Sequence, residues 1–144
     1  MKECSAKASE YCYNYAANCI ERSRKVLEEI GNRNMVLVTN FYGNIQSVLR
    51  DFRLDFFKEI VESSRVGVRK PDPRIYELGV DRLGMDAKEI VVVGDSYDKD
   101  IIPAKAIGCK TVWLQGEGWG KAPEDVSAAD AVITSIARLP QILL

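Results

Sequence analysis

The sequence contains no histidine, and this absence excludes several kinds of active site. A Ser/His/Asp or Cys/His triad, a histidine general base and a histidine metal ligand all require the missing residue. Any catalysis must therefore run on carboxylates, hydroxyls, lysine and a hard metal ion.

Long apolar runs are missing as well. No stretch approaches the roughly 18 consecutive apolar residues that a membrane span needs, and residues 1–5 carry no apolar segment typical of a signal peptide. We therefore expect a cytoplasmic protein without a membrane partner.

Cysteine is scarce, and its spacing argues against a metal site. The four cysteines are Cys4, Cys12, Cys19 and Cys109, and no two of them form a CxxC pair. We interpret them as buried free thiols rather than as disulfide partners or metal ligands.

Neither sign of charge dominates the chain. It has 20 basic and 21 acidic residues, a formal net charge of -1, and basic residues scattered among the acids. This pattern argues against a nucleic-acid partner, because proteins that bind nucleic acid carry clustered basic residues that neutralise its phosphates. The length of 144 residues predicts a single domain over residues 1–144, long enough to be stabilised by a hydrophobic core without disulfides or metal.

Apolar runs alternate with helical periodicity along the chain, which indicates an α/β fold with a parallel sheet and right-handed crossovers. Residues 66–73, with two prolines and a glycine, predict an irregular loop, and we interpret the glycine-rich residues 116–120 as a plain loop. The predicted strands cover residues 35–40, 59–63, 91–94, 110–114 and 131–134; the predicted helices cover residues 5–30 (one or two helices), 43–54, 73–83, about 100–107 and 136–144.

Residues 91–100, VVVGDSYDKD, are the most informative segment. Their β-branched run suits a strand buried on both faces, and ligands of open α/β sheets bind beyond the carboxyl ends of such strands. Asp95 and Asp100 follow the strand and provide the oxygen ligands that Mg²⁺ prefers. The alternative is that these acids only cap the next helix.

Thr39, Asn40 and Lys70 also lie at the carboxyl end of a predicted strand or in a loop beside one. In a parallel sheet these positions meet Asp95 at one edge, where a hydroxyl, an amide, an ammonium and a metal-binding carboxylate can surround a phosphoryl group. Taken singly, Thr39 is better explained as a helix cap and Lys70 as a solvated loop lysine.

Together and in this order, the motifs resemble those of the haloacid dehalogenase-like (HAD) hydrolases, from about residue 24 to 136. Residues 36–40 look like the family's second motif, whose Thr39 binds a phosphoryl oxygen beside Asn40, and Lys70 looks like its third-motif lysine. Asp95 and Asp100 look like the fourth motif, which implies Mg²⁺ ligation by Asp95 with support from Asp100. The resemblance implies catalytic roles for Thr39, Lys70 and Asp95, and substrate binding by Thr39, Asn40 and Lys70.

The chain differs from the family at its first motif, DxDx[TV], which is absent because no aspartate precedes Asp51. In the family that motif ends a central strand, so we expect a three-layer Rossmann-like sheet whose central strand, between those ending near Thr39 and Asp95, is missing. The resemblance implies that residues 1–20 are a remnant of a helical cap, and a homodimer is one way to cover the missing strand.

The resemblance implies a Mg²⁺-dependent phosphatase of small phosphorylated metabolites, similar to phosphoglycolate phosphatases and nucleotidases. Because the first motif is missing, we expect a truncated form of such an enzyme, with little or no activity alone. The alternative is a non-catalytic domain that binds phosphate or metal, or interacts with a partner. A receiver-like phosphoacceptor is a third reading, although receivers place their acids before the hydroxyl and the lysine. Phe41, Tyr42, Tyr97 and Trp119 are candidates for the rim of the site or for ordinary packing.

Overall fold

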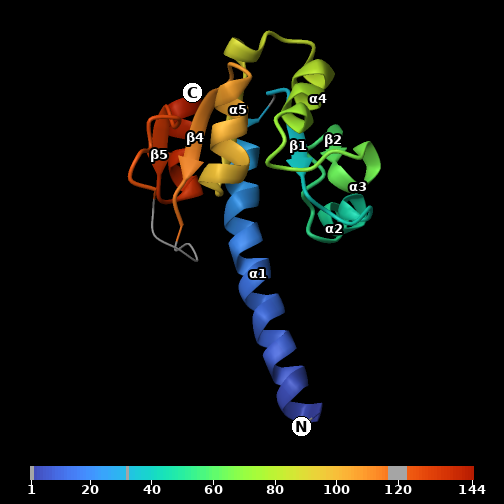
Figure 1. The fold of residues 1–144 in the computed structure, drawn as a ribbon. Helices are drawn as coiled ribbons and strands as arrows, with labels where there is room; N and C mark the ends of the chain where they lie inside the picture. Colours follow the sequence, from blue (N-terminus) through green and yellow to red (C-terminus); the bar gives the residue numbers. More distant parts are fainter. Residues whose placement is uncertain (1, 32, 117–122) are drawn as a thin grey trace.

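A computed structural model describes the whole chain except residues 1, 32 and 117–122, and it shows an α/β protein with a long N-terminal helix (Figure 1). That helix, α1 (Lys2–Ile30), is a single element rather than two. Among the described helices, none combines the length and the apolar character needed to cross a bilayer.

The strands form two parallel sheets. β1 (Val36–Thr39) pairs with β2 (Glu59–Glu62), and β4 (Lys110–Leu114) lies between β3 (Val91–Gly94) and β5 (Ala131–Ile133). Within the described residues no strand joins β1 to β3. The predicted α/β fold is therefore confirmed, and the interruption lies between the two strands where a central strand was expected to be missing.

The α-helices follow the predicted alternation, and the short helix α3 is an addition. It begins at the last residue of the predicted strand 59–63 and ends at the first residue of the predicted loop 66–73. The β3 strand leads into a π-helical turn that continues directly as α5, and this turn places the acidic residues of the motif at a helix start. The elements are α2 (Ile45–Asp51), α3 (Ser63–Val66), α4 (Arg74–Leu83), the π-helical turn (Tyr97–Ile101), α5 (Ile102–Ala106), α6 (Pro140–Leu143) and two short 3-10 helices (Ala87–Glu89 and Ile136–Arg138).

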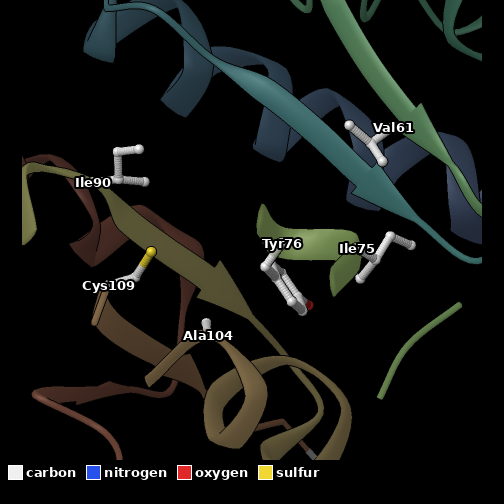
Figure 2. Close-up of a cluster of buried hydrophobic side chains, with 6 residues drawn as sticks. All are labelled: Val61, Ile75, Tyr76, Ile90, Ala104 and Cys109. Atoms are coloured by element: carbon white, nitrogen blue, oxygen red, sulfur yellow. The ribbon is translucent and has the colours of Figure 1, made fainter. Parts of the chain in front are cut away.

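Two apolar clusters hold helices on opposite faces of the sheets. On one face α4 and α5 pack over the strands through Val61, Ile75, Tyr76, Ile90, Ala104 and Cys109 (Figure 2). On the other face the end of α1 packs against β4 and β5 through Val26, Ile30, Val112, Ile133 and Leu139. These layers are the helix, sheet, helix arrangement predicted from the alternation.

The prediction that the cysteines are buried is wrong for Cys12 and Cys19 of α1. Cys109 is buried as expected and is a free thiol, but Cys12 is exposed and Cys19 is only partly buried. The reason is that the first turns of α1 extend away from the sheets (Figure 1), so their apolar side chains have little to pack against. Tyr15, on the same helix face, is 64% exposed. The described residues do not include the side chain of Cys4.

Glu62, at the end of β2, is a buried carboxylate that caps the start of α2. Its side chain is 1% exposed, and its Oε1 accepts hydrogen bonds from the backbone N–H of Gly43 at 2.6 Å and of Ile45 at 3.4 Å. Arg65 Nε lies 3.1 Å from the other carboxylate oxygen, Oε2, which has no hydrogen-bond partner of good geometry in the described residues. The contact with Arg65 is thus mainly electrostatic.

We expect the replacement Glu62→Ala to lower the free energy of unfolding by about 1–3 kcal/mol, because it leaves two backbone donors at the start of α2 without their acceptor. Urea unfolding measures this loss. The control is Glu59→Ala on the same strand, whose exposed ion pair with Arg82 contributes at most about 1 kcal/mol. Equal losses in the two variants would contradict the capping role.

Candidate functional site

Asn40 connects the end of β1 to the loop that carries Lys70. The backbone N–H of Lys70 donates to Asn40 Oδ1 at 2.9 Å, and Asn40 Nδ2 donates to the Lys70 carbonyl at 3.2 Å. An amide that both donates to and accepts from one residue fixes the position of that residue. Asn40 therefore positions the backbone of Lys70, while Thr39, the last residue of β1, lies directly beside this contact.

Asp100 accepts hydrogen bonds from three elements at the end of β3. Its Oδ1 accepts from Lys70 Nζ and from the Tyr76 hydroxyl, each at 2.7 Å, and its Oδ2 accepts from the backbone N–H of Ser96 at 3.0 Å. The residue is 4% exposed. Such a buried carboxylate is stable only with partners of this kind, because an unpaired charge in this position is very costly.

Gly94 allows Asp100 to come this close to the end of β3. A Cβ atom on Gly94 would lie 2.3 Å from Asp100 Cβ and 2.7 Å from its Oδ2, which no side chain permits. Gly94 is thus required for the close approach of the Asp100 side chain to the end of β3.

The electrostatics of the cluster keep Asp100 charged. Burial alone raises the pKa of Asp100, but the Lys70 ammonium and the hydrogen bonds from Lys70, Tyr76 and Ser96 outweigh burial and hold the pKa below its usual value. For Tyr76 the effects add up: burial, and then the charge of Asp100, raise the pKa of the phenol far above its ordinary value. Asp100 is therefore a carboxylate at neutral pH, and Tyr76 is a neutral donor.

Asp95 differs from Asp100 because it is exposed. Its backbone carbonyl accepts a hydrogen bond from Trp113 Nε1 at 3.0 Å, which fixes the loop after β3 to the neighbouring strand β4. The main chain of Asp95 is held in place while its carboxylate remains accessible to a ligand.

The structure brings three of the predicted site residues into direct contact. Asn40 after β1, Lys70 in the loop and Asp100 after β3 form one hydrogen-bonded series that crosses between the two sheets at the carboxyl ends of their strands. Thr39 is the last residue of β1, and Asp95 follows directly after the last residue of β3. The series lies where a parallel α/β sheet binds its ligands.

Tyr76 was not predicted as part of this site. It lies in α4, within a helix whose sequence shows only an ordinary apolar face, and its hydroxyl contacts Asp100 from 24 residues away. Lys70 Nζ also lies 5.7 Å from the centre of the Tyr76 ring, a cation–π contact. Nothing local in the sequence marks a tyrosine whose partner is so distant.

The aromatic residues proposed for the rim have different positions. Tyr97 is buried, and its ring packs edge to face on Trp113 at 5.1 Å between centroids, so it belongs to the core. Tyr42 is 90% exposed and, with Phe41, lines a depression of about 370 Å³ that also contacts Asn40, Ser63, Ser64 and Arg69. Trp119, like most of the glycine-rich segment 116–120, falls outside the described residues.

The acidic residues at the site suit a hydrated hard cation such as Mg²⁺ better than a metal ion held entirely by protein side chains. Among the described residues no group of three or more His, Cys, Asp or Glu side chains is placed to hold a metal. Mg²⁺ needs no such group, because it keeps several waters and usually takes one or two carboxylates with a substrate phosphate. Exposed Asp95 is free to act as such a ligand, whereas Asp100 already accepts three hydrogen bonds, two of them on Oδ1.

Comparison with known proteins places these motifs in a family. Residues 2–114 match the family model described as haloacid dehalogenase-like hydrolase. The glyceraldehyde 3-phosphate phosphatase of Methanocaldococcus jannaschii is 39% identical over 88 residues, which are 61% of this chain and 38% of that enzyme.

Solved structures show the same fold. A predicted phosphoglycolate phosphatase from Haemophilus somnus aligns with a TM-score of 0.71 and 26% identity over 84% of this chain and 55% of that chain. The HAD-hydrolase YfnB from Bacillus subtilis, solved bound to magnesium, aligns with a TM-score of 0.69 and 27% identity over 81% of this chain and 53% of that chain. The present chain thus matches about half or less of the length of these relatives.

Proposed function

Because this chain belongs to the haloacid dehalogenase-like hydrolase family, we propose that it provides the phosphate-binding and Mg²⁺-binding part of a phosphohydrolase that acts on small phosphorylated metabolites. The observation that carries this proposal is the contact between Lys70 and Asp100, which joins the loop after one sheet to the end of the other. It brings an ammonium and a carboxylate together at the edge where β1 and β3 end.

Each residue has a chemical role in this proposal. The Thr39 hydroxyl and the Asn40 amide lie at the end of β1, where they bind phosphoryl oxygens. Lys70 uses one of its three N–H donors on Asp100 and retains the others for the negative charge of the phosphate. Preplaced donors and cations are the main source of catalysis in phosphoryl transfer, since charge spreads over the phosphoryl oxygens in the transition state.

The proposed metal ligand is the exposed carboxylate of Asp95. Asp100, five residues further along the chain, supports the site, and among the described residues its Oδ2 accepts only one hydrogen bond. When bound, Mg²⁺ supplies positive charge that neutralises the phosphate oxygens. Asp100 contributes chiefly by fixing Lys70, and Tyr76 fixes Asp100 in turn.

The depression beside Asn40 supports a small substrate. It adjoins the phosphate-binding end of β1 and offers two serines, an exposed aromatic ring and Arg69 to the part of the substrate that carries the phosphate. The relatives named above include an enzyme for a three-carbon phosphate, which is a size that such a depression accepts.

We expect wild-type protein to bind Mg²⁺ in the presence of inorganic phosphate, and the replacement Asp95→Asn to abolish this binding. Asp95 is the proposed carboxylate ligand, so its neutralisation removes the charge that attracts the cation. Isothermal titration calorimetry measures the binding, and Asp98→Asn, an exposed neighbour on the same turn, is the matched control. Equal binding by wild type and Asp95→Asn would contradict the assignment.

A second candidate function is binding without turnover. The described site offers an ammonium and an exposed carboxylate for phosphate and metal, whereas its buried carboxylate, Asp100, already accepts three hydrogen bonds and is not placed to act as a nucleophile. Hydrolysis of p-nitrophenyl phosphate separates the two candidates: turnover that is lost with EDTA and in Asp95→Asn supports the hydrolase, whereas Mg²⁺ and phosphate binding with no turnover supports the binding domain.

A further inference from the structure

Glu62 and Arg65 hold Gly43 by both groups of its backbone. The Gly43 N–H donates to Glu62 Oε1 at 2.6 Å, and the Gly43 carbonyl accepts from Arg65 Nη2 at 2.9 Å. Arg65 Nε lies 3.1 Å from Glu62 Oε2, so the two side chains also attract each other. We call these two residues the corner pair, because they lie where β2 ends and α3 begins. Two contacts on one residue fix its orientation as well as its position.

The corner pair sets the shape of the loop between β1 and α2 from outside that loop. Asn44, the N-cap residue of α2, makes no side-chain hydrogen bond to the helix start, and Glu62 accepts from the Ile45 N–H instead. Gly43 has a φ of +99°, which other residues rarely adopt. The conformation of this loop therefore depends on a glycine and on two side chains that lie 19 and 22 residues away in the sequence.

The held loop directly follows the residues that we assign to phosphate binding. Asn40 precedes Gly43 by three residues, and its side chain makes two hydrogen bonds to the Lys70 backbone. The loop that carries Lys70 begins after α3, the helix that contains Arg65. The corner pair thus connects the two segments between which the contact of Asn40 with Lys70 forms.

The same two segments form the walls of the depression beside Asn40. Residues 40–42 line it from the held loop, and residues 63, 64 and 67–69 line it from the segment that starts at the corner. Ser63 Oγ also donates to the Phe41 carbonyl at 3.5 Å, from one wall to the other. A movement of the loop relative to the corner therefore changes both the depression and the contact with Lys70.

The charge of Glu62 goes beyond what a helix cap needs. Neutral Ser, Thr and Asn side chains are common acceptors at helix starts, so an uncharged oxygen is sufficient there. A carboxylate that is 1% exposed is more costly to bury than a hydroxyl or an amide. What the charge adds here is the attraction for Arg65, whose guanidinium then reaches the Gly43 carbonyl.

We propose that Glu62 and Arg65 are positioning residues of the phosphate site: by holding Gly43 they orient Asn40, and through Asn40 they fix Lys70. Neither residue lines the depression, so neither is a catalytic residue. The effect on phosphate rests on the proposed function above, whereas the hold on Asn40 and Lys70 does not.

The replacement Glu62→Gln separates this positioning role from helix capping. Glutamine keeps a carbonyl oxygen for the Gly43 N–H, but it lacks the charge that attracts Arg65. We expect the Lys70 amide, which donates to Asn40, to exchange its hydrogen about fivefold faster than in wild type, as for the loss of one hydrogen bond. The matched control is Glu59→Gln, an equal change of charge at an exposed position of the same strand, and it leaves this rate unchanged.

Phosphate affinity gives a second measurement, in which positioning and simple electrostatics act in opposite directions. Glu62→Gln removes a negative charge near the site, which by charge alone favours an anion, whereas the loss of positioning weakens its binding. In Arg65→Ala both effects weaken it. We expect inorganic phosphate with Mg²⁺ to bind about fivefold more weakly to both variants in isothermal titration calorimetry, and to bind Glu59→Gln like wild type. Circular dichroism shows whether each variant is folded.

Three results for Glu62→Gln would overturn the proposal. They are a Lys70 amide that exchanges at the wild-type rate, an equal acceleration of the amides of β4, which indicates a general loss of stability, and phosphate binding that is as tight as in wild type or tighter. Wild-type protein that binds no phosphate would contradict the proposed function instead. Exchange of the Lys70 amide would then still decide whether the corner pair holds Asn40.

Discussion

Replacing Gly94 with alanine is expected to destabilise the protein by about 3 kcal/mol and to separate Asp100 from Lys70, because overpacking costs up to about that much before any hydrogen bond is lost. The added methyl group would lie 2.3 Å from Asp100 Cβ and 2.6 Å from its Cγ, so the π-helical turn has to move. Urea unfolding measures the loss of stability.

The control for this prediction is Gly116→Ala, where an added Cβ meets no atom within 4 Å. We expect that substitution to change the free energy of unfolding by less than about 0.5 kcal/mol, as for most exposed positions. If Gly94→Ala is as mild as Gly116→Ala, the turn after β3 adapts easily and the glycine does not define the position of Asp100.

Removing Asp100 is expected to have the largest effect of any single change at the site. Asp100→Ala leaves the Lys70 ammonium, 17% exposed, without its partner, and breaking a buried ion pair in this way costs about 3–5 kcal/mol. Lys70→Met is also expected to be destabilising, because it leaves the buried Asp100 carboxylate without its cationic partner. The double variant should lose less than the sum of the two single losses, since neither charge is then left alone.

The same contact predicts a dependence on pH. The pKa of Asp100 is lower in the folded chain than its usual value, so the ionised residue stabilises the fold above about pH 3.9, the usual pKa of aspartate. This stability is lost as the pH falls through the lowered pKa. Unfolding measured at several pH values should therefore show the advantage of wild type over Asp100→Asn shrinking in acid, whereas Asp98→Asn, an exposed control, shows no such change. A constant difference would contradict the ion pair.

Much of the fold is predictable from the sequence because local patterns determine it. The run of residues 110–114 predicts β4 with the bounds that the structure shows, and the β-branched run before Gly94 predicts β3. Two prolines and a helical period likewise locate the loop before α4 and α4 itself. In these segments backbone preference and burial favour the same structure.

The site is only partly predictable, because its contacts join distant residues. Lys70 and Asp100 were expected at one edge, and they meet there, but the hydroxyl of Tyr76 and the clamp of Asn40 on the Lys70 backbone depend on tertiary packing. The exposed Cys12 shows the same limit: a helical period identifies one face of α1, yet it does not reveal whether another element covers that face.

Base and acid act differently on the hydrogen bond from Tyr76 to Asp100. Since burial and the neighbouring carboxylate raise the pKa of this phenol, Tyr76 still carries its proton in alkaline solution and continues to donate to Asp100. Protonation of the carboxylate, in contrast, removes the charge that holds Lys70 in place. The tyrosine's hydrogen bond to Asp100 therefore persists in base, whereas acid weakens the hold of Asp100 on Lys70 and so loosens the connection between the two sheets.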